Sequence, residues 1–280
     1  MKFDNDKVEA WINAVDRSLV GLKSTTQNSK SPILLLGAGV LELYAELGWI
    51  APLRRGKTGD LDLSVGLVAS SGEYAEFVQA FKDLNYHLDK DHPYRWHSPN
   101  RIPGAMTYVD ILSHQATDAV GEDEARASMS VTSEFSLNGM RFAMETGYTV
   151  LNSIRIPRFV GMLALKLYAY QNSPDRRRKD LADVVEICWS LVEKGHHFDF
   201  GTEWVDLESH KECQFVRRSL EALVGSESTN WDIEDIRQEL LSRKFSSDEI
   251  ETTISLRLRD FLETVPEKAS KAMLRTPLLK

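Results

Sequence analysis

Two aspartates separated by one residue are the clearest candidates for chemistry in this chain. Asp60 and Asp62 alternate with Leu61 and Leu63, so a strand would place both carboxylates on one face and both leucines on the other. Paired acids disfavour a strand but suit Mg²⁺, which prefers one or two carboxylates together with phosphate oxygens and water. Acid-x-acid patterns are also common in solvated loops, and for the pair alone that alternative stays open.

A glycine-rich turn lies upstream of the two acids. Gly37, Ala38 and Gly39 follow an apolar run over residues 33–36, which predicts a buried strand ending in a turn. The backbone N–H groups of such a turn can bind phosphate. Neither a Walker ending nor a dinucleotide fingerprint follows, so the turn could equally serve only to connect a strand with a helix. Together with the acids, it indicates metal-assisted chemistry on a nucleoside triphosphate.

Three further charged residues stand in apolar or helix-forming surroundings. Asp110 interrupts an apolar run, where a charge needs a partner or a metal unless it only caps the following turn. Lys166 lies in an apolar helix pattern and either extends to water or binds an anion such as triphosphate. Asp180 and Asp183 open a helix after a basic run, and the helix dipole alone is a sufficient structural reason for both.

The elements that must position these residues are strands before about residue 155 and helices after it. The predicted helices cover residues 5–22, 40–47, 73–84, a segment beginning at Pro157, 179–191, and a segment that Ser247 caps. The predicted strands cover residues 33–36, 61–68, 94–97, 106–112, 130–137, 140–144 and 148–151, and residues 98–104 have the composition of a hairpin loop. We therefore expect an α+β fold, with a catalytic domain over residues 1–155 and a mostly helical domain over residues 156–280.

Composition narrows the classes of function. The chain has 280 residues and a net charge of −8, so nucleic-acid contact would need a local basic patch, such as Arg54, Arg55 and Lys57 with residues 176–179. The two cysteines and seven histidines show no spacing typical of a metal site or disulfide framework. We see no signal peptide and no membrane-spanning run, and expect a cytoplasmic protein.

The order of these features resembles the nucleotidyltransferase superfamily, which has the polymerase-beta-like fold. Its pattern is a strand, a glycine turn, a helix, an acid-x-acid strand and a third acid on a later strand. The turn at residues 37–39, the pair Asp60 and Asp62, and then Asp110 follow that order. The resemblance implies a small mixed sheet flanked by helices and followed by a helical C-terminal region.

The second half narrows the resemblance. Lys-Leu-Tyr-Ala at residues 166–169 and Arg-Lys-Asp-Leu-Ala-Asp at residues 178–183 are similar to motifs of AbiEii-type toxin nucleotidyltransferases from type IV toxin–antitoxin systems. The resemblance covers residues 33–190. It implies that Asp60, Asp62 and Asp110 bind Mg²⁺ or Mn²⁺ and that Asp110 activates the acceptor hydroxyl. The other roles it implies are nucleotide binding by Gly37, Gly39 and Thr58, charge neutralisation on the triphosphate by Lys166, and orientation of the site by Asp180.

The implied reaction moves a nucleoside monophosphate from an NTP, such as ATP, to an acceptor hydroxyl and releases pyrophosphate. Toxin relatives modify tRNA, so tRNA is the expected acceptor and an antitoxin protein an expected partner. Two alternatives remain at this point. One is a small-molecule transferase of the aminoglycoside-modifying kind, whose acceptor suits an acidic protein. The other is a catalytically silent nucleotide-binding or protein-interaction module.

Overall fold

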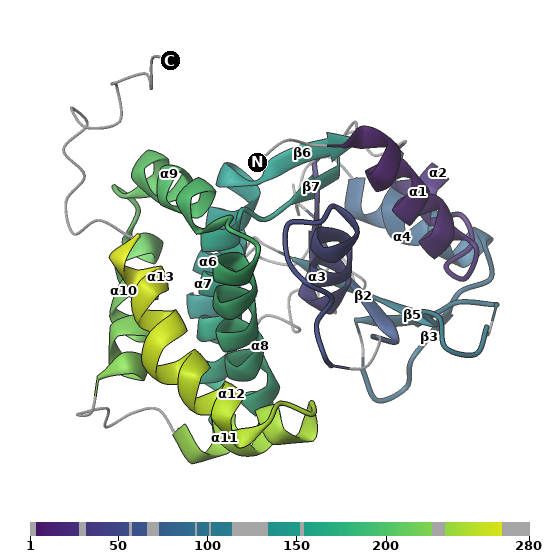
Figure 1. Cartoon of the computed structure of the whole chain (residues 1–280). Coiled ribbons are helices and arrows are strands. Elements are labelled where there is room, and N and C mark those ends of the chain that lie inside the picture. The colour runs from purple at the N-terminus through teal and green to yellow at the C-terminus, as the bar shows by residue number, and fades with distance from the viewer. Residues whose placement is uncertain are drawn as a thin grey trace.

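The protein has an α+β fold, with one mixed sheet and a helical C-terminal region, as the sequence predicts (Figure 1). The computed structural model describes residues 4–27, 32–55, 58–65, 73–92, 94–100, 102–113, 134–151, 154–225 and 233–264. Figure 1 shows the sheet and helices α1 to α4 on one side of the molecule, and the stack of helices α7 to α13 on the other.

Seven strands of the described residues form the sheet, in the order β3-β4-β5-β2-β1-β7-β6. They are β1 (Ile33–Leu36), β2 (Asp60–Val65), β3 (His87–Leu88), β4 (Arg95–His97), β5 (Tyr108–Ser113), β6 (Tyr148–Leu151) and β7 (Ile154–Ile156). Strand β2 runs antiparallel to β1 and parallel to β5, and β4 pairs antiparallel with β5 as the predicted hairpin requires. The two strands that carry the predicted acids, β2 and β5, are therefore neighbours at the centre of the sheet.

Alternation gives the central strands two different faces. Leu35 of β1 and its register partner Leu63 of β2 are buried in the large core that α1 (Asn5–Asp16), α3 (Gly37–Glu46) and α4 (Glu73–Asp83) share. Leu36 and its register partner Asp62 lie on the opposite face, where Leu36 packs against α6 (Glu134–Thr146). The acids therefore lie on the face of the sheet opposite the core that the body of α3 covers.

The C-terminal region is built around two long helices. α7 (Phe159–Asn172) and α8 (Pro174–Glu193) pack on each other, with Ser173 ending the first and Pro174 opening the second. The others are α9 (His197–Leu207), α10 (Lys211–Val224), α11 (Ile233–Ser242), α12 (Ser247–Thr252), the π-helical turn η1 (Thr253–Arg257) and α13 (Leu258–Glu263). Helix α10 packs on α7, and α11 and α13 pack on α8. Residue 155 lies within β7, and the division into two domains there stays a prediction.

Several predicted elements differ from the structure. The helix expected over residues 5–22 ends at Asp16, and a second helix, α2 (Leu22–Gln27), follows Gly21, whose φ of +78° breaks the pattern. The strands expected within residues 134–144 are wrong, because this segment is the helix α6. Its buried Met140, Ala143 and Met144 have the spacing of one helix face, which covers β1. The predicted residues 66–68 and 130–133 lie outside the described part of the chain.

The cap of α12 is displaced by one residue from its predicted position. Ser246, not Ser247, accepts the hydrogen bond from the backbone N–H of Glu249, whose side chain accepts from the N–H of Ser246 in return. This reciprocal capping box satisfies two backbone donors at once, which Ser247 could not do one residue further along.

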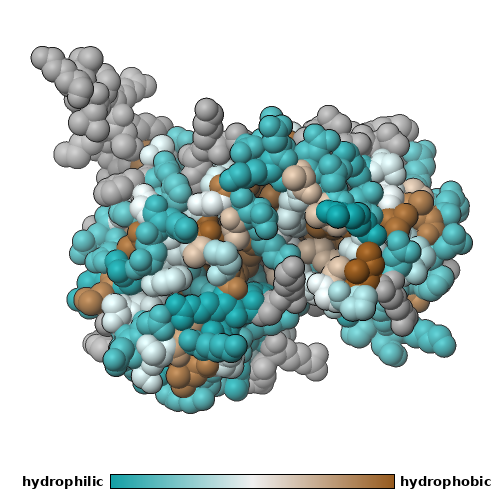
Figure 2. Space-filling model, turned by 45° about the vertical axis from the view of Figure 1, so that its right-hand side comes forward, coloured by the Kyte–Doolittle hydropathy of each residue, from teal (hydrophilic) through white to brown (hydrophobic). Residues whose placement is uncertain are grey.

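The described residues on the face drawn in Figure 2 are mostly hydrophilic, with small, separate hydrophobic groups. Among described residues, the large exposed hydrophobic side chains are Ile102, Leu241 and Leu256. Within the same residues, every helix is too short or too polar to cross a bilayer.

Candidate active site

The three predicted acids meet on one face of the sheet. Asp60 and Asp62 lie on β2, and Asp62 is the direct register partner of Asp110 on the parallel strand β5. One carboxylate oxygen from each of the three lies within 4.8 Å of the other two. Carboxylate oxygens this close repel one another unless cations or protons compensate them. The arrangement is therefore one that a divalent cation can occupy.

Burial and mutual repulsion change the acidity of this cluster. Burial raises the pKa of Asp62 to about 7, and the charges of Asp60 and Asp110 act in the same direction. Burial also raises the pKa of Asp110, although the guanidinium of Arg95 beside it opposes that change. A bound cation would favour the ionised form of Asp62, because it compensates the negative charges that raise the pKa of this carboxyl.

The glycine turn is shaped around Asp62. Gly37 has a φ of +70°, and a Cβ atom at this position would overlap Oδ2 of Asp62. Helix α3 begins here, and its N-cap residue, Leu36, makes no side-chain capping bond. The turn thus leaves room for the Asp62 carboxylate and directs a helix N-terminus toward it, as an anion site requires.

The second glycine of the turn does not face the acids. Gly39 is buried, and a Cβ atom there would come within 2.8 Å of Leu61 Cδ1, on the core side of the sheet. Successive helix residues are rotated by about 100°, so two positions two residues apart point about 200° apart. Gly37 and Ala38 line the pocket, whereas Gly39 supports the close packing of α3 on β2.

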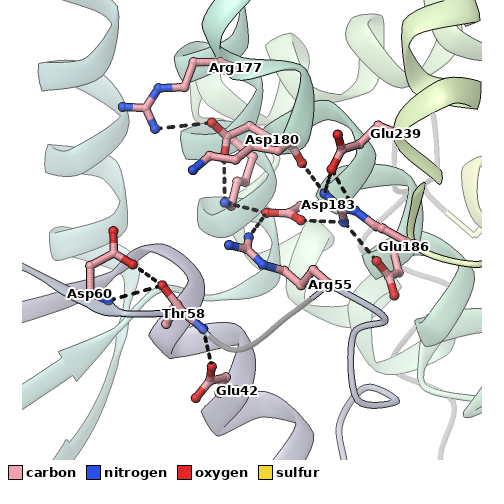
Figure 3. Close-up of polar contacts among 12 residues, drawn as sticks. Glu42, Arg55, Thr58, Asp60, Arg177, Asp180, Asp183, Glu186 and Glu239 are labelled. Atoms are coloured by element: carbon pink, nitrogen blue, oxygen red, sulfur yellow. Dashed lines mark hydrogen bonds and ion pairs between the residues drawn. The ribbon is translucent and has the colours of Figure 1, made fainter. Parts of the chain in front are cut away.

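Thr58 stands next to Asp60 rather than in the pocket with it. Its hydroxyl hydrogen bonds to Oδ1 of Asp60, and its backbone N–H donates to Glu42 Oε1 at 3.1 Å (Figure 3). Thr58 is buried, so its described contacts orient Asp60 and join the strand to α3.

Lys166 is buried and paired with two carboxylates of α8. Its Nζ donates to Asp180 Oδ1 at 2.6 Å and to Asp183 Oδ2 at 2.7 Å. Burial disfavours the ammonium, but the charges of Asp183 and Asp180 outweigh that cost and raise the pKa of Lys166. Lys166 therefore does not extend to water; it contacts carboxylate side chains, and its binding of triphosphate stays a prediction.

Asp183 is the centre of the ionic network that Figure 3 shows. Besides Lys166, its carboxylate accepts from Arg55 Nη1 and from Arg243 Nη1, both at 2.7 Å. Burial opposes the charged form, but the three cations outweigh it and lower the pKa of Asp183. Arg243 also donates to Glu186 at 3.0 Å. The network ties the loop before β2 to helices α7 and α8.

A pocket of about 380 Å³ joins these groups. Its floor is the acid face of β2 and β5, and its other walls are the start of α3 and helices α7 and α8. The sequence-predicted residues that line it are Gly37, Asp60, Asp62, Asp110, Lys166 and Asp180. The additional charged residues around it are Arg55, Arg95, Arg177 and Lys179.

The predicted basic rim is only partly at the pocket. Arg55, Arg177 and Lys179 line it, and Arg177 reaches Asp180 at 3.5 Å. Arg54 instead lies over the ring of Phe245, 4.0 Å from its centre, and pairs with Glu249. Arg178 likewise pairs with Asp235 at 2.8 Å, and Lys57 lies outside the described residues.

Sequence reasoning missed Arg95, which makes the closest described ion pair to the acid cluster. Its Nε and Nη2 each donate to one oxygen of Asp110, both at 2.8 Å. The hairpin prediction contained the necessary signal, because its register places Arg95 directly opposite Asp110. The sequence also predicts Asp183 only as an acid at a helix start, which is wrong, because α8 begins at Pro174 and Asp183 is fully buried in its interior.

Comparison of the chain with models of known protein families gives no match, and comparisons with curated proteins and with solved structures give none either.

Proposed function

We propose that this protein is a Mg²⁺-dependent nucleotidyltransferase that moves a nucleoside monophosphate from an NTP to an acceptor hydroxyl. The observation that supports this most is the cluster of Asp60, Asp62 and Asp110, drawn from two paired strands into one pocket with a helix N-terminus. The order of motifs along the sequence, which resembles the AbiEii-type enzymes, supports it independently.

The residues fit a divalent metal. Asp60 and Asp62 present two carboxylates on one strand face, and Gly37 leaves the space that the Asp62 carboxylate occupies. These two side chains would hold Mg²⁺, which when bound supplies positive charge to the phosphoryl group being transferred. Thr58 would keep Asp60 oriented through its hydroxyl.

The chain's own groups would hold the triphosphate. The first residues of α3, Gly37 and Ala38, line the pocket, and Leu36 gives the helix no side-chain cap, so we expect the first backbone N–H groups of α3 to bind phosphate oxygens. On the opposite wall, Arg177 is half-exposed and makes a long 3.5 Å contact with Asp180, so its guanidinium is available for phosphate oxygens. Lys166 keeps Asp180 in place on this wall. Phosphoryl transfer depends mainly on such positioning and charge neutralisation.

The acceptor that the sequence resemblance indicates is a tRNA, with the protein acting as a toxin that an antitoxin partner restrains. A small-molecule acceptor is the second candidate. The net charge of −8 favours it, because a protein of this charge attracts a large nucleic acid only through a local patch. Of the basic residues that the sequence predicts for such a patch, Arg55, Arg177 and Lys179 line the pocket.

The proposal is tested by incubating the protein with each α-labelled NTP, Mg²⁺ and total tRNA, and separately with an aminoglycoside. The variant Asp60→Asn/Asp62→Asn removes two charges at nearly constant volume, and Asp91→Asn, an exposed loop acid, is the matched control. We expect label on the acceptor with the wild type and the control, and none with the double variant. Nucleotide binding without transfer to either acceptor would refute both enzyme proposals.

A further inference from the structure

Arg95 forms a fixed, shielded ion pair with the third acid of the cluster. Both oxygens of Asp110 accept hydrogen bonds from its guanidinium, and the Asp110 side chain is only 6% exposed. The guanidinium also lies over the ring of Tyr108, 3.9 Å from its centre. The bidentate hydrogen bonds and the cation–π contact together give the guanidinium one preferred position.

The register of two strands also brings this pair together. Arg95 and Asp110 are register partners of the antiparallel strands β4 and β5, so their side chains emerge side by side on one face. The hydrogen bond to Asp110 raises the pKa of Arg95 further above its ordinary value. The strand register and these hydrogen bonds therefore hold the two charges side by side.

The charges of the cluster then balance one divalent ion. Asp60, Asp62 and Asp110 carry three negative charges when ionised, and Arg95 compensates one of them. The two that remain belong to Asp60 and Asp62. A second divalent ion on Asp110 would lie against the guanidinium of Arg95, and like charges this close at a buried site repel strongly.

We propose that Arg95 takes the place of a second metal ion, so that the cluster binds a single divalent cation held by Asp60 and Asp62. Asp110 then serves as the anchor of Arg95 rather than as a shared metal ligand. This inference rests on the proposed function, because it concerns the same metal site, but it adds the number of ions and assigns a role to Arg95.

The experiment counts Mn²⁺ ions bound to the full chain, by electron paramagnetic resonance of free Mn²⁺. We expect one ion for the wild type and none for Asp60→Asn/Asp62→Asn. Removal of the guanidinium in Arg95→Gln frees Asp110 and raises the number to two, whereas Arg95→Lys keeps a positive charge and leaves it at one. Arg158→Gln is the matched control, because Arg158 also lies over a tyrosine ring (5.1 Å from the centre of Tyr148) and faces an aspartate.

A second variant keeps the test decisive if Arg95→Gln does not fold. Arg95→Gln/Asp110→Asn removes the two opposite charges together, so we expect one bound Mn²⁺ with an affinity within about threefold of the wild type. A tenfold weakening, about 1.4 kcal/mol, would show that Asp110 is a metal ligand. Two ions on the wild type, or one on a folded Arg95→Gln, would overturn the inference and leave the proposed function standing. Failure of the wild type to bind any ion would refute the metal site itself.

Discussion

Two glycines at opposite ends of α3 offer a direct test of the metal site. Gly37, the first residue of the helix, and Gly48, just beyond its C-terminal end, have φ values of +70° and +77°. A Cβ atom at position 48 meets nothing within 4 Å, whereas one at position 37 overlaps Oδ2 of Asp62. Gly37→Ala and Gly48→Ala therefore impose the same backbone cost, and only the first disturbs a predicted metal ligand.

The magnitudes separate the two effects. An alanine held in the left-handed region costs roughly 1–2 kcal/mol, so both variants should lose about this much free energy of unfolding. The added clash at position 37 falls mainly on the end of the Asp62 side chain, which can rotate away. The clash therefore weakens metal binding rather than the stability of the metal-free protein. An ion at about one hundred times its Kd stabilises the folded state by about 2.7 kcal/mol, and Gly37→Ala should lose most of that gain.

Urea unfolding followed by circular dichroism, with and without saturating Mg²⁺, measures both quantities. We expect similar losses of stability for the two variants without Mg²⁺, and a Mg²⁺-dependent gain only for the wild type and Gly48→Ala. An equal gain for Gly37→Ala would refute our reasoning about the turn. The absence of any gain in the wild type would refute the metal site on which it depends.

Two further predictions concern buried charges. Lys166→Met leaves Asp180 and Asp183 without their shared ammonium, so it should lower the free energy of unfolding by roughly 3–5 kcal/mol. The control Lys23→Met removes an exposed ion pair and should cost less than about 1 kcal/mol. Urea unfolding measures both losses. Burial raises the pKa of Glu203 from 4.5 to about 7, so the folded state holds a proton there that the unfolded chain releases. Wild-type stability should fall by roughly 3 kcal/mol relative to Glu203→Gln between about pH 4.5 and 7, and a constant difference between the two urea midpoints across that range would contradict the raised pKa.

The central strands could be predicted because their signal is local. The apolar run at residues 33–36 is buried throughout, and it forms β1 with the predicted bounds. Alternation around Asp60 and Asp62 gave the start of β2 to within one residue and the common face of the two carboxylates. Where apolar spacing admits both periods, as in residues 134–146, the sequence alone could not distinguish a strand from the helix that covers β1.

Residues of the site could be predicted only where a charged side chain stands among apolar sequence neighbours, because burying an unpaired charge is unfavourable. Asp110 and Lys166 are charged residues within apolar runs, so each position predicts a partner of opposite charge or a bound ion. Arg95 is different, because an arginine beside aromatic residues is ordinary in a half-exposed strand, and only the hairpin register brings it to Asp110. The sequence predicts Asp183 at a helix start, which is a sufficient local reason for an acid, whereas the residue lies inside α8 and three cations converge on it.

The ionic network explains why the site needs both parts of the fold. Each cation nearest the sheet has a carboxylate of its own: Arg95 is paired with Asp110, and Lys166 with Asp180 and Asp183. That leaves the pair Asp60 and Asp62 as the concentrated negative charge on the sheet. The positive charge at the pocket's edge comes instead from α8 and the start of α3. A metal–triphosphate complex carries both signs of charge, so it matches this division only where the sheet and the helices face each other. A change that separates α8 from β2, such as loss of the contact between Arg55 and Asp183, should therefore weaken nucleotide binding without altering any residue of the acid cluster.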